Sequence, residues 1–126
     1  MVVQRKSVAG FDAVMNLLKD LAGTHNVFVL FCGSKDAQTG DSWCPDCVKA
    51  WPVIEESLKL LPDDAVFIYC DVGARDYWKD KANPFRTEPK LKLTGVPTLL
   101  KWNTRKRLGD QECTKKSLVE LLFTDE

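Results

Sequence analysis

The stretch VFVLFCGSKDAQTGDSWCPDCVKAWP, residues 27–52, joins an apolar run to a helical pattern through a polar loop. Residues 27–32 are a continuous run of β-branched, aromatic and other apolar side chains, which predicts a strand buried on both faces. From Cys44 onward, apolar residues recur at alternating steps of four and three, which predicts a helix with Cys47 on its buried side. Pro45 suits the first helical position, where a missing N–H costs little. Two cysteines therefore open a helix that follows a buried strand.

The rest of the chain repeats these patterns of strand and helix. Before this stretch we predict a helix between Gly10 and a capping Gly23. After it we predict a strand over residues 65–72, loops around one short helix over 73–95, and a strand over 96–103. A hairpin through 103–106 then leads to a last helix capped by Thr114. A length of 126 residues suits one domain, here residues 1–126. We predict an α/β fold with a central mixed β-sheet flanked by helices on both faces.

Composition restricts the partners that the protein is expected to have. Eighteen Lys plus Arg balance eighteen Asp plus Glu, so no general attraction to nucleic acid or an anionic membrane is expected. The first residues lack the apolar core of a signal peptide, and no run approaches the ~18 apolar residues of a membrane span. Five cysteines, an odd number, argue against a secreted disulfide framework. We expect a monomeric cytoplasmic protein with reduced thiols and neither a nucleic-acid nor a membrane partner.

The cysteine pair has three possible interpretations. A structural zinc site needs about four ligands, whereas the chain offers one such pair and a single histidine, His25, so we expect no metal. Packing suits Cys32 and Cys70, which lie inside apolar strands, but not Cys44, which follows a polar loop. A redox pair explains the spacing, because residues three apart in a first helical turn come close enough to bridge their sulfurs. The redox interpretation is favoured.

The position of Cys44 predicts a reactive thiol. Unpaired N–H groups and the helix dipole would favour its thiolate and lower its pKa to roughly 3.5–7.5, although the charge of Asp46 opposes this. We expect an exposed Cys44 to act as the nucleophile and a shielded Cys47 to act as the resolving thiol. Trp43 is expected to shield the sulfurs and to offer an apolar contact for substrate.

Three separated motifs resemble the thioredoxin superfamily. WCPDC, residues 43–47, is similar to the thioredoxin active site, Pro52 falls where thioredoxins kink the active-site helix, and GVPTLLKW, residues 95–102, is similar to the strand with their cis-proline. The resemblance spans nearly the whole chain and implies a thioredoxin fold. It also implies that Pro97 is a cis-proline opposite the cysteines and that the Val96 backbone hydrogen-bonds an extended substrate.

The resemblance is strongest to the small cytosolic thioredoxin-related proteins, and it implies an activity. That activity is a protein-disulfide and cystine reductase that binds no cofactor and is recharged by NADPH through thioredoxin reductase. The implied substrates are cystine, other small disulfides, glutathionylated proteins and a dynein light chain, with weak peroxidase activity. The alternative is a thioredoxin-fold adaptor that senses redox state and binds partners without turnover.

Two departures from ordinary thioredoxins bear on this resemblance. Leu30 stands near the place where thioredoxins bury an aspartate that helps to deprotonate the second cysteine. The acids that could replace it, among which the sequence does not choose, are Asp36, Asp41 and Asp46. The loop of residues 33–42 and the segment 73–85 are longer than in thioredoxins, and we expect them to narrow the range of substrates.

Overall fold

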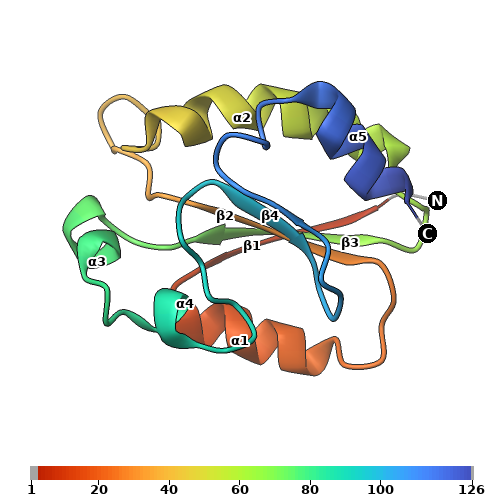
Figure 1. Ribbon diagram of the computed structural model, residues 1–126, viewed down its shortest axis with the longest axis horizontal. Coiled ribbons are helices and arrows are strands. Elements are labelled where there is room, and N and C mark those ends of the chain that lie inside the picture. Colours follow the sequence, from red (N-terminus) through yellow and green to blue (C-terminus); the bar gives the residue numbers. More distant parts are fainter. Residues whose placement is uncertain (1–2, 126) are drawn as a thin grey trace.

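The computed structural model describes residues 3–125, which contain one five-stranded sheet in the order β1-β3-β2-β4-β5 (Figure 1). The strands are β1 (Gln4–Ala9), β2 (Val27–Cys32), β3 (Val66–Asp71), β4 (Thr98–Lys101) and β5 (Arg107–Leu108). β1 and β2 pair in parallel with β3, while β4 is antiparallel to both β2 and β5. The predicted mixed sheet is therefore confirmed.

Helices cover both faces of this sheet, as predicted (Figure 1). They are α1 (Phe11–Asp20), α2 (Pro45–Ser57), which continues into the 3-10 turn η1 (Leu58–Leu60), α3 (Arg75–Lys79), α4 (Pro84–Thr87) and α5 (Lys116–Thr124). α2 and α5 lie over one face, α1 and α4 lie over the other, and α3 lies beyond one end of the sheet. Within residues 3–125, no helix combines the length and apolar character that crossing a membrane requires.

The central strand β2 is buried along its whole length, as its apolar run predicts. Successive side chains point to opposite faces of the sheet. On one face the Phe28 ring meets that of Phe123 from α5 at 5.2 Å, and on the other the Phe31 ring meets that of Phe85 from α4 at 6.0 Å. Burying each phenylalanine contributes on the order of 1.5–3 kcal/mol, so β2 ties the two helical layers together.

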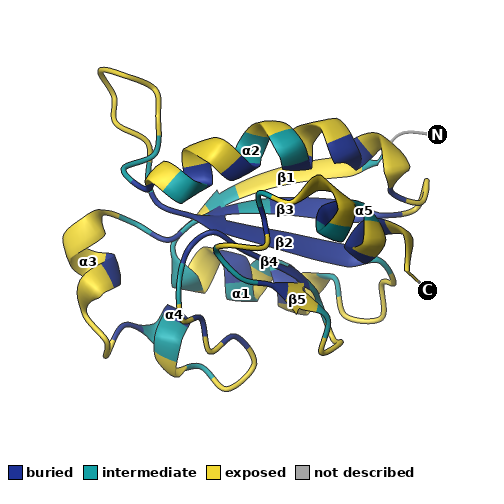
Figure 2. Cartoon of the chain, turned by 45° about the horizontal axis from the view of Figure 1, so that its top comes forward, coloured by how far each residue is buried: buried dark blue, intermediate teal, exposed yellow. Residues whose placement is uncertain are grey.

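The first strand, β1, is absent from the sequence-based prediction. Its residues, QRKSVA, are almost all exposed, and Figure 2 shows this strand in yellow beside the dark blue of its neighbours. It lies at the edge of the sheet, where charged side chains are common and one row of backbone groups pairs with β3. This strand is specified by non-local backbone pairing, so an apolar pattern does not reveal it.

Two predicted helix ends are wrong. α1 ends at Asp20, before the turn that contains Gly23, whose φ is +86°. α5 begins at Lys116 with Lys115 before it, and the Thr114 hydroxyl donates instead to the carbonyl of Gln111 at 3.1 Å. Each end differs by only a few residues from the predicted one, which is the usual uncertainty of helix boundaries.

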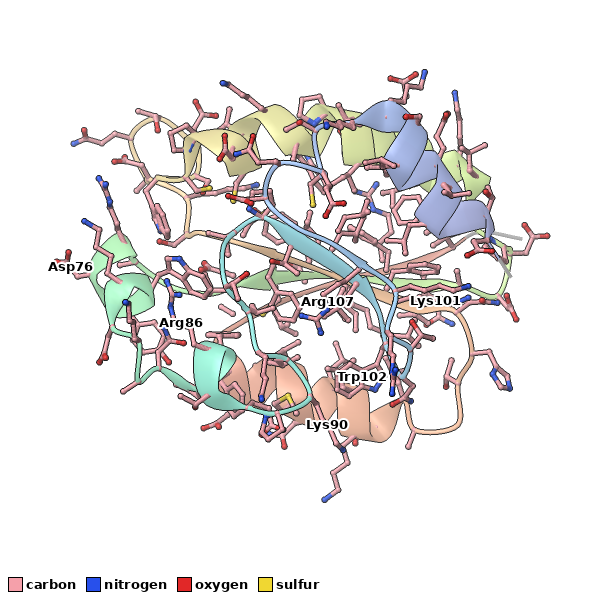
Figure 3. All side chains as sticks on the ribbon, viewed as in Figure 1. Asp76, Arg86, Lys90, Lys101, Trp102 and Arg107 are labelled. Carbon is pink, nitrogen blue, oxygen red and sulfur yellow. The ribbon has the colours of Figure 1, made fainter. Side chains whose placement is uncertain are left out.

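The segment of residues 73–95 carries two short helices, where one was predicted. The buried amide of Asn83 joins them, because its Nδ2 donates to the carbonyls of Tyr77, Trp78 and Asp80 at 3.3, 3.1 and 2.8 Å. Arg86, labelled in Figure 3, extends from α4 and places its guanidinium 4.1 Å from the centre of the Trp78 ring. These contacts fix α3 to α4.

Candidate active site

The loop between β2 and α2 is held by a chain of hydrogen bonds that ends at Cys44. The backbone N–H of Trp43 donates to the Ser34 carbonyl at 3.1 Å, and the Ser42 hydroxyl donates to the Gly33 carbonyl at 2.9 Å. The same hydroxyl accepts the N–H of Cys44 at 3.1 Å. The end of β2 therefore determines where α2 begins. Figure 2 shows the outer part of this loop as exposed.

Trp43 is packed against the backbone of two glycines. Its Nε1 donates to the Gly73 carbonyl at 2.8 Å, and its ring lies so close to Gly33 that a Cβ there would overlap the indole. The ring is half-buried and borders a pocket beside the first cysteine. Trp43 therefore borders the space beside Cys44 from a fixed position, and its shielding of the sulfurs stays a prediction.

Cys44 occupies the N-cap of α2, and Pro45 follows at the first helical position, as predicted. The Cys44 Sγ accepts the backbone N–H of Cys47 at 3.2 Å, and its thiol donates to the Val96 carbonyl at 3.4 Å. The peptide bond between Val96 and Pro97 is cis, as the resemblance implies. Cys44 is only 5% exposed, so the prediction of an exposed thiol is wrong. The reason is that the Val96 loop, distant in sequence, covers the sulfur.

The electrostatic surroundings of Cys44 differ from the prediction. Its pKa is raised, first by the hydrogen bond with the Cys47 side chain, then by burial, the charge of Cys47 and the charge of Asp46. The backbone N–H of Cys47 acts in the opposite direction and lowers this pKa. This direction is opposite to the expected lowering of the pKa, and the effect of Asp46 is in the predicted direction. The raised pKa and the hydrogen bond to the Val96 carbonyl both favour the protonated form of Cys44.

Cys47 is 2% exposed and therefore shielded, as predicted. Its pKa is raised first by a side-chain hydrogen bond with Cys32, while a side-chain hydrogen bond with Cys44 and the backbone N–H of Gly33 lower it. The sequence-based reasoning assigned Cys32 to packing and missed this contact. The alternation of β2 was the available signal, because Cys32 lies two residues after Leu30 and so faces the same side.

Within residues 3–125, none of the three candidate acids makes a hydrogen bond to Cys47, so none replaces the missing aspartate in that way. Asp36 is exposed, and its Oδ1 accepts the N–H of Gln38 at 2.7 Å within the loop. Asp41 is also exposed, and Asp46 is half-buried in the first turn of α2. The side chain that does interact with Cys47 is the thiol of Cys32.

Asp71, which the sequence-based reasoning did not consider, supports the site from β3. It pairs in register with Cys32, and its Oδ1 accepts the N–H of Gly73 at 2.7 Å. Gly73 in turn provides the carbonyl that receives the indole N–H of Trp43. The carboxylate thus orients the loop on which Trp43 rests.

Cys113 lies beneath the cis-proline loop. It is fully buried, and its thiol lies 3.6 Å from the Leu108 carbonyl and 3.9 Å from that of Pro97. Burial raises the pKa of Cys113 to about 12. This thiol is therefore part of the packing below the site.

A pocket of about 340 Å³ adjoins Cys44. Its lining comes from the start of α2, from α3, from the cis-proline loop and from the turn after β5: Trp43, Cys44, Pro45, Arg75, Trp78, Gly95, Val96 and Asp110. It is large enough for one half of a small disulfide, and it borders the sulfur predicted to react.

The Cys-Pro-Asp-Cys sequence lies at the start of a helix and opposite a cis-proline, and the helix packs on a mixed sheet with this strand order. These features together define a thioredoxin-like domain. Residues 7–125 match the family described as Thioredoxin domain-containing protein 17-like, thioredoxin domain, and the chain belongs to this family.

Individual relatives agree with this assignment. The chain is 51% identical over 120 residues to Thioredoxin domain-containing protein 17 of Mus musculus, and the aligned region covers 95% of this chain and 94% of that protein. It is 48% identical to the Homo sapiens protein of that name, with the same coverage. It is also 41% identical over 95 residues to the Thioredoxin-like protein Clot of Arabidopsis thaliana, covering 73% of this chain and 71% of that protein.

Proposed function

We propose that this protein is a dithiol-disulfide oxidoreductase that reduces disulfides with Cys44 as nucleophile and Cys47 as resolving thiol. The observation that carries the proposal is the geometry of the pair. Cys44 caps α2 with its sulfur 3.2 Å from the N–H of Cys47, and the same sulfur borders a pocket. A backbone N–H aimed at a sulfur stabilises its anion, which is the attacking form.

Substrate binding at Val96 provides a reason for Cys44 to lose its proton. At rest the thiol donates to the Val96 carbonyl at 3.4 Å. An extended substrate would pair with this backbone as an added strand does, and its N–H would take the carbonyl from the thiol. Cys44 would then lose one acceptor of its proton and keep the backbone N–H donor of Cys47, which favours the thiolate. The proton leaves to solvent, so reactivity follows substrate binding.

The chemistry then proceeds by two exchanges. The Cys44 thiolate attacks one substrate sulfur, the substrate S–S bond breaks, and the first product leaves as a thiolate that takes a proton from solvent. Cys47 then loses its proton and attacks the Cys44 sulfur, which releases the second product thiolate. Two electrons have passed to the substrate, and Cys44 and Cys47 end as a disulfide. We propose that NADPH restores the dithiol through thioredoxin reductase, with no cofactor bound to this chain.

The pocket favours small substrates. Its volume of about 340 Å³ suits cystine and glutathione-linked groups, which are the proposed substrates together with a dynein light chain. The loop of residues 33–42 and the segment 73–85 flank this end of the sheet and would hinder larger proteins (Figure 1). We propose the cytoplasm as the location and weak peroxidase activity as a side reaction of the same thiol.

The experiment that tests this function combines turnover with trapping. With thioredoxin reductase and cystine, the protein should sustain NADPH consumption. The Cys47→Ser variant should accumulate a mixed disulfide detectable by mass, while Cys44→Ser should be inert. Turnover that survives in Cys44→Ser would refute the assignment.

The burial of Cys44 favours a second candidate, an adaptor that uses the pair only to sense redox state. The residue Cys44 is only 5% exposed and the pKa of its thiol is raised, and such a thiol reacts slowly unless a partner uncovers it. The same assay separates the two candidates, because an adaptor would show one stoichiometric oxidation and no sustained consumption of NADPH.

A further inference from the structure

Two adjoining pockets lie beside the β4–β5 hairpin and share three lining residues, Lys90, Trp102 and Asn103. We propose that together they bind a phosphate monoester with an aromatic body. The phosphate would lie in the first pocket, of about 210 Å³, between Lys90 and Arg107. The aromatic ring would lie against Trp102, toward the second pocket, of about 420 Å³, on α1.

This site is separate from the cysteine pair. β4 begins at Thr98, directly after the cis-proline opposite Cys44, and it runs antiparallel to β2. It ends at Lys101, directly before Trp102. Trp102 therefore lies at the far end of this strand from Cys44, and binding there does not depend on the reductase function.

The alternation of β4 decides which of its side chains face the two pockets. Leu100 pairs with Arg107 of β5, so Arg107 and Trp102, two residues after Leu100, lie on the same face of the sheet. Lys101 lies on the other face, where its Nζ is 5.7 Å from the centre of the Phe28 ring beneath α5. The ammonium group of Lys101 is therefore directed away from the site, although this residue lines the first pocket.

Arg107 is held beside the loop that carries Lys90. Its Nη1 donates to the carbonyl of Leu91 at 2.7 Å, which fixes the guanidinium next to Lys90. Its other N–H groups have no hydrogen-bond partner among residues 3–125. A guanidinium presents a fork of donors that matches the oxygens of a phosphate. Figure 3 shows Arg107, Trp102 and Lys90 following one another from the sheet toward α1.

The positive charges around Trp102 have no counter-charge. Lys19 of α1 adds a third cation at the second pocket. Lys19, Lys90 and Arg107 form no ion pair within residues 3–125, and no Asp or Glu of this part of the chain lines either pocket. The whole chain has no net charge, so this excess is local. Like charges repel one another, and a bound dianion would remove that repulsion.

Trp102 provides a surface for the organic part of the ligand. Its ring is half-buried and borders both pockets, and Met15 and Leu18 from α1 line the second pocket beyond it. Apolar walls with a few well-placed polar groups are typical of small-molecule sites, and aromatic rings pack favourably on tryptophan. Inorganic phosphate would use the cations alone, whereas an aromatic monoester would use both parts of the site.

Titration of the wild-type protein with phenyl phosphate, inorganic phosphate and phenol tests the proposal. The readout is the backbone N–H signal of Asn103 in nuclear magnetic resonance spectra, because Asn103 lines both pockets. Phenyl phosphate should bind about tenfold more tightly than inorganic phosphate, and phenol should not saturate the signal. Lys90→Gln should weaken both phosphates about fivefold, and Lys90→Glu should weaken them further.

Two further variants separate the fork and the ring from charge alone. Arg107→Lys keeps the charge but not the fork, so it should weaken phosphate binding less than Arg107→Gln does. Trp102→Leu should weaken phenyl phosphate about tenfold but leave inorganic phosphate unchanged. Lys90 is exposed, so its variants should stay folded and keep the proposal testable even if Trp102→Leu does not fold.

The controls remove a cation close to the site but outside it. Lys101→Gln acts on the opposite face of the same strand, and Arg105→Gln acts on an exposed side chain of the hairpin that lines neither pocket. Both should leave all affinities unchanged. Equal weakening by these two variants and by Lys90→Gln would show only a general attraction to a positive surface and would overturn the proposal. Absence of saturable binding of phenyl phosphate to the wild-type protein would overturn it too.

A peptide with one phosphotyrosine between glycines distinguishes two sources of the ester. Binding tighter than that of phenyl phosphate would assign the site to a phosphorylated segment of a partner, and equal or weaker binding would assign it to a small ester. Both results agree with the site. Disulfide reduction by Lys90→Gln should equal that of the wild-type protein, so the outcome for this site and the outcome for the reductase function are independent.

Discussion

Replacing Gly33 with alanine places a methyl group where the Trp43 ring now lies. The φ of Gly33 is outside the left-handed region, so the backbone accepts alanine without strain and the cost comes from the ring alone. The indole has to move, and in moving it loses the hydrogen bond from Nε1 to the Gly73 carbonyl at 2.8 Å.

The expected cost follows from these contacts. Overpacking a site of this kind costs about 1–3 kcal/mol, within which the lost hydrogen bond accounts for roughly 0.5–1.5 kcal/mol. Alanine also restricts the unfolded chain, which raises the free energy of unfolding by about 0.4–1 kcal/mol. Gly33→Ala should therefore lower the free energy of unfolding by roughly 1–2 kcal/mol. In a Trp43→Ala background the space is empty, and the same change should cost nothing or stabilise slightly.

The assay is urea unfolding of the four proteins of this cycle, followed by far-ultraviolet circular dichroism because two of them lack Trp43. Gly109→Ala is the matched control, since its added Cβ would meet only Glu112 at 3.6 Å, and it should change stability by less than about 0.5 kcal/mol. An equal cost of Gly33→Ala in both backgrounds would refute the assignment of that cost to the ring of Trp43.

Three further predictions follow from buried groups. Asn83→Ala removes the donor shared by three carbonyls and should lower the free energy of unfolding by about 1–3 kcal/mol, so unchanged urea stability would contradict its role. Burial raises the pKa values of Cys70 and Cys113 from 9.0 to about 12, so the unfolded chain loses these protons first. Stability should therefore fall above about pH 9 by up to ~1.4 kcal/mol per pH unit for each thiol, and a variant with valine at both positions should show a shallower fall. Cys32→Ala should lower the pKa of Cys47, measured by nuclear magnetic resonance titration of its Cβ, and an unchanged or higher value would exclude the contact between them.

The parts of the fold that the sequence predicted are those that local patterns encode. β2 and β3 are apolar runs because both of their faces are covered, and the start of α2 follows from a proline that suits the first helical position. β1 was missed because its information is non-local. Its side chains are polar and exposed, and only its register with β3, beginning with Gln4 opposite Val66, makes it a strand.

The same distinction applies to the site. The positions of Cys44 and Cys47 within the first turn of α2 could be predicted, because they depend on residues only three apart. The burial of Cys44 could not, because the carbonyl that covers it belongs to Val96, 52 positions away. The contact between Cys32 and Cys47 could be predicted only in part. The alternation of β2 determines the face of the sheet on which Cys32 lies, but not the distance from Cys32 to α2.

These non-local contacts reconcile a buried sulfur with exchange chemistry. A helix start alone would produce an exposed thiolate that reacts with any disulfide it meets. Here the Cys44 thiol donates to the Val96 carbonyl, and an extended substrate would compete for that same carbonyl. Activation of the thiol and recognition of the substrate would then depend on a single acceptor. A protein with this arrangement would remain unreactive toward disulfides that cannot enter the pocket, even though its cysteine pair is similar to that of a general reductase.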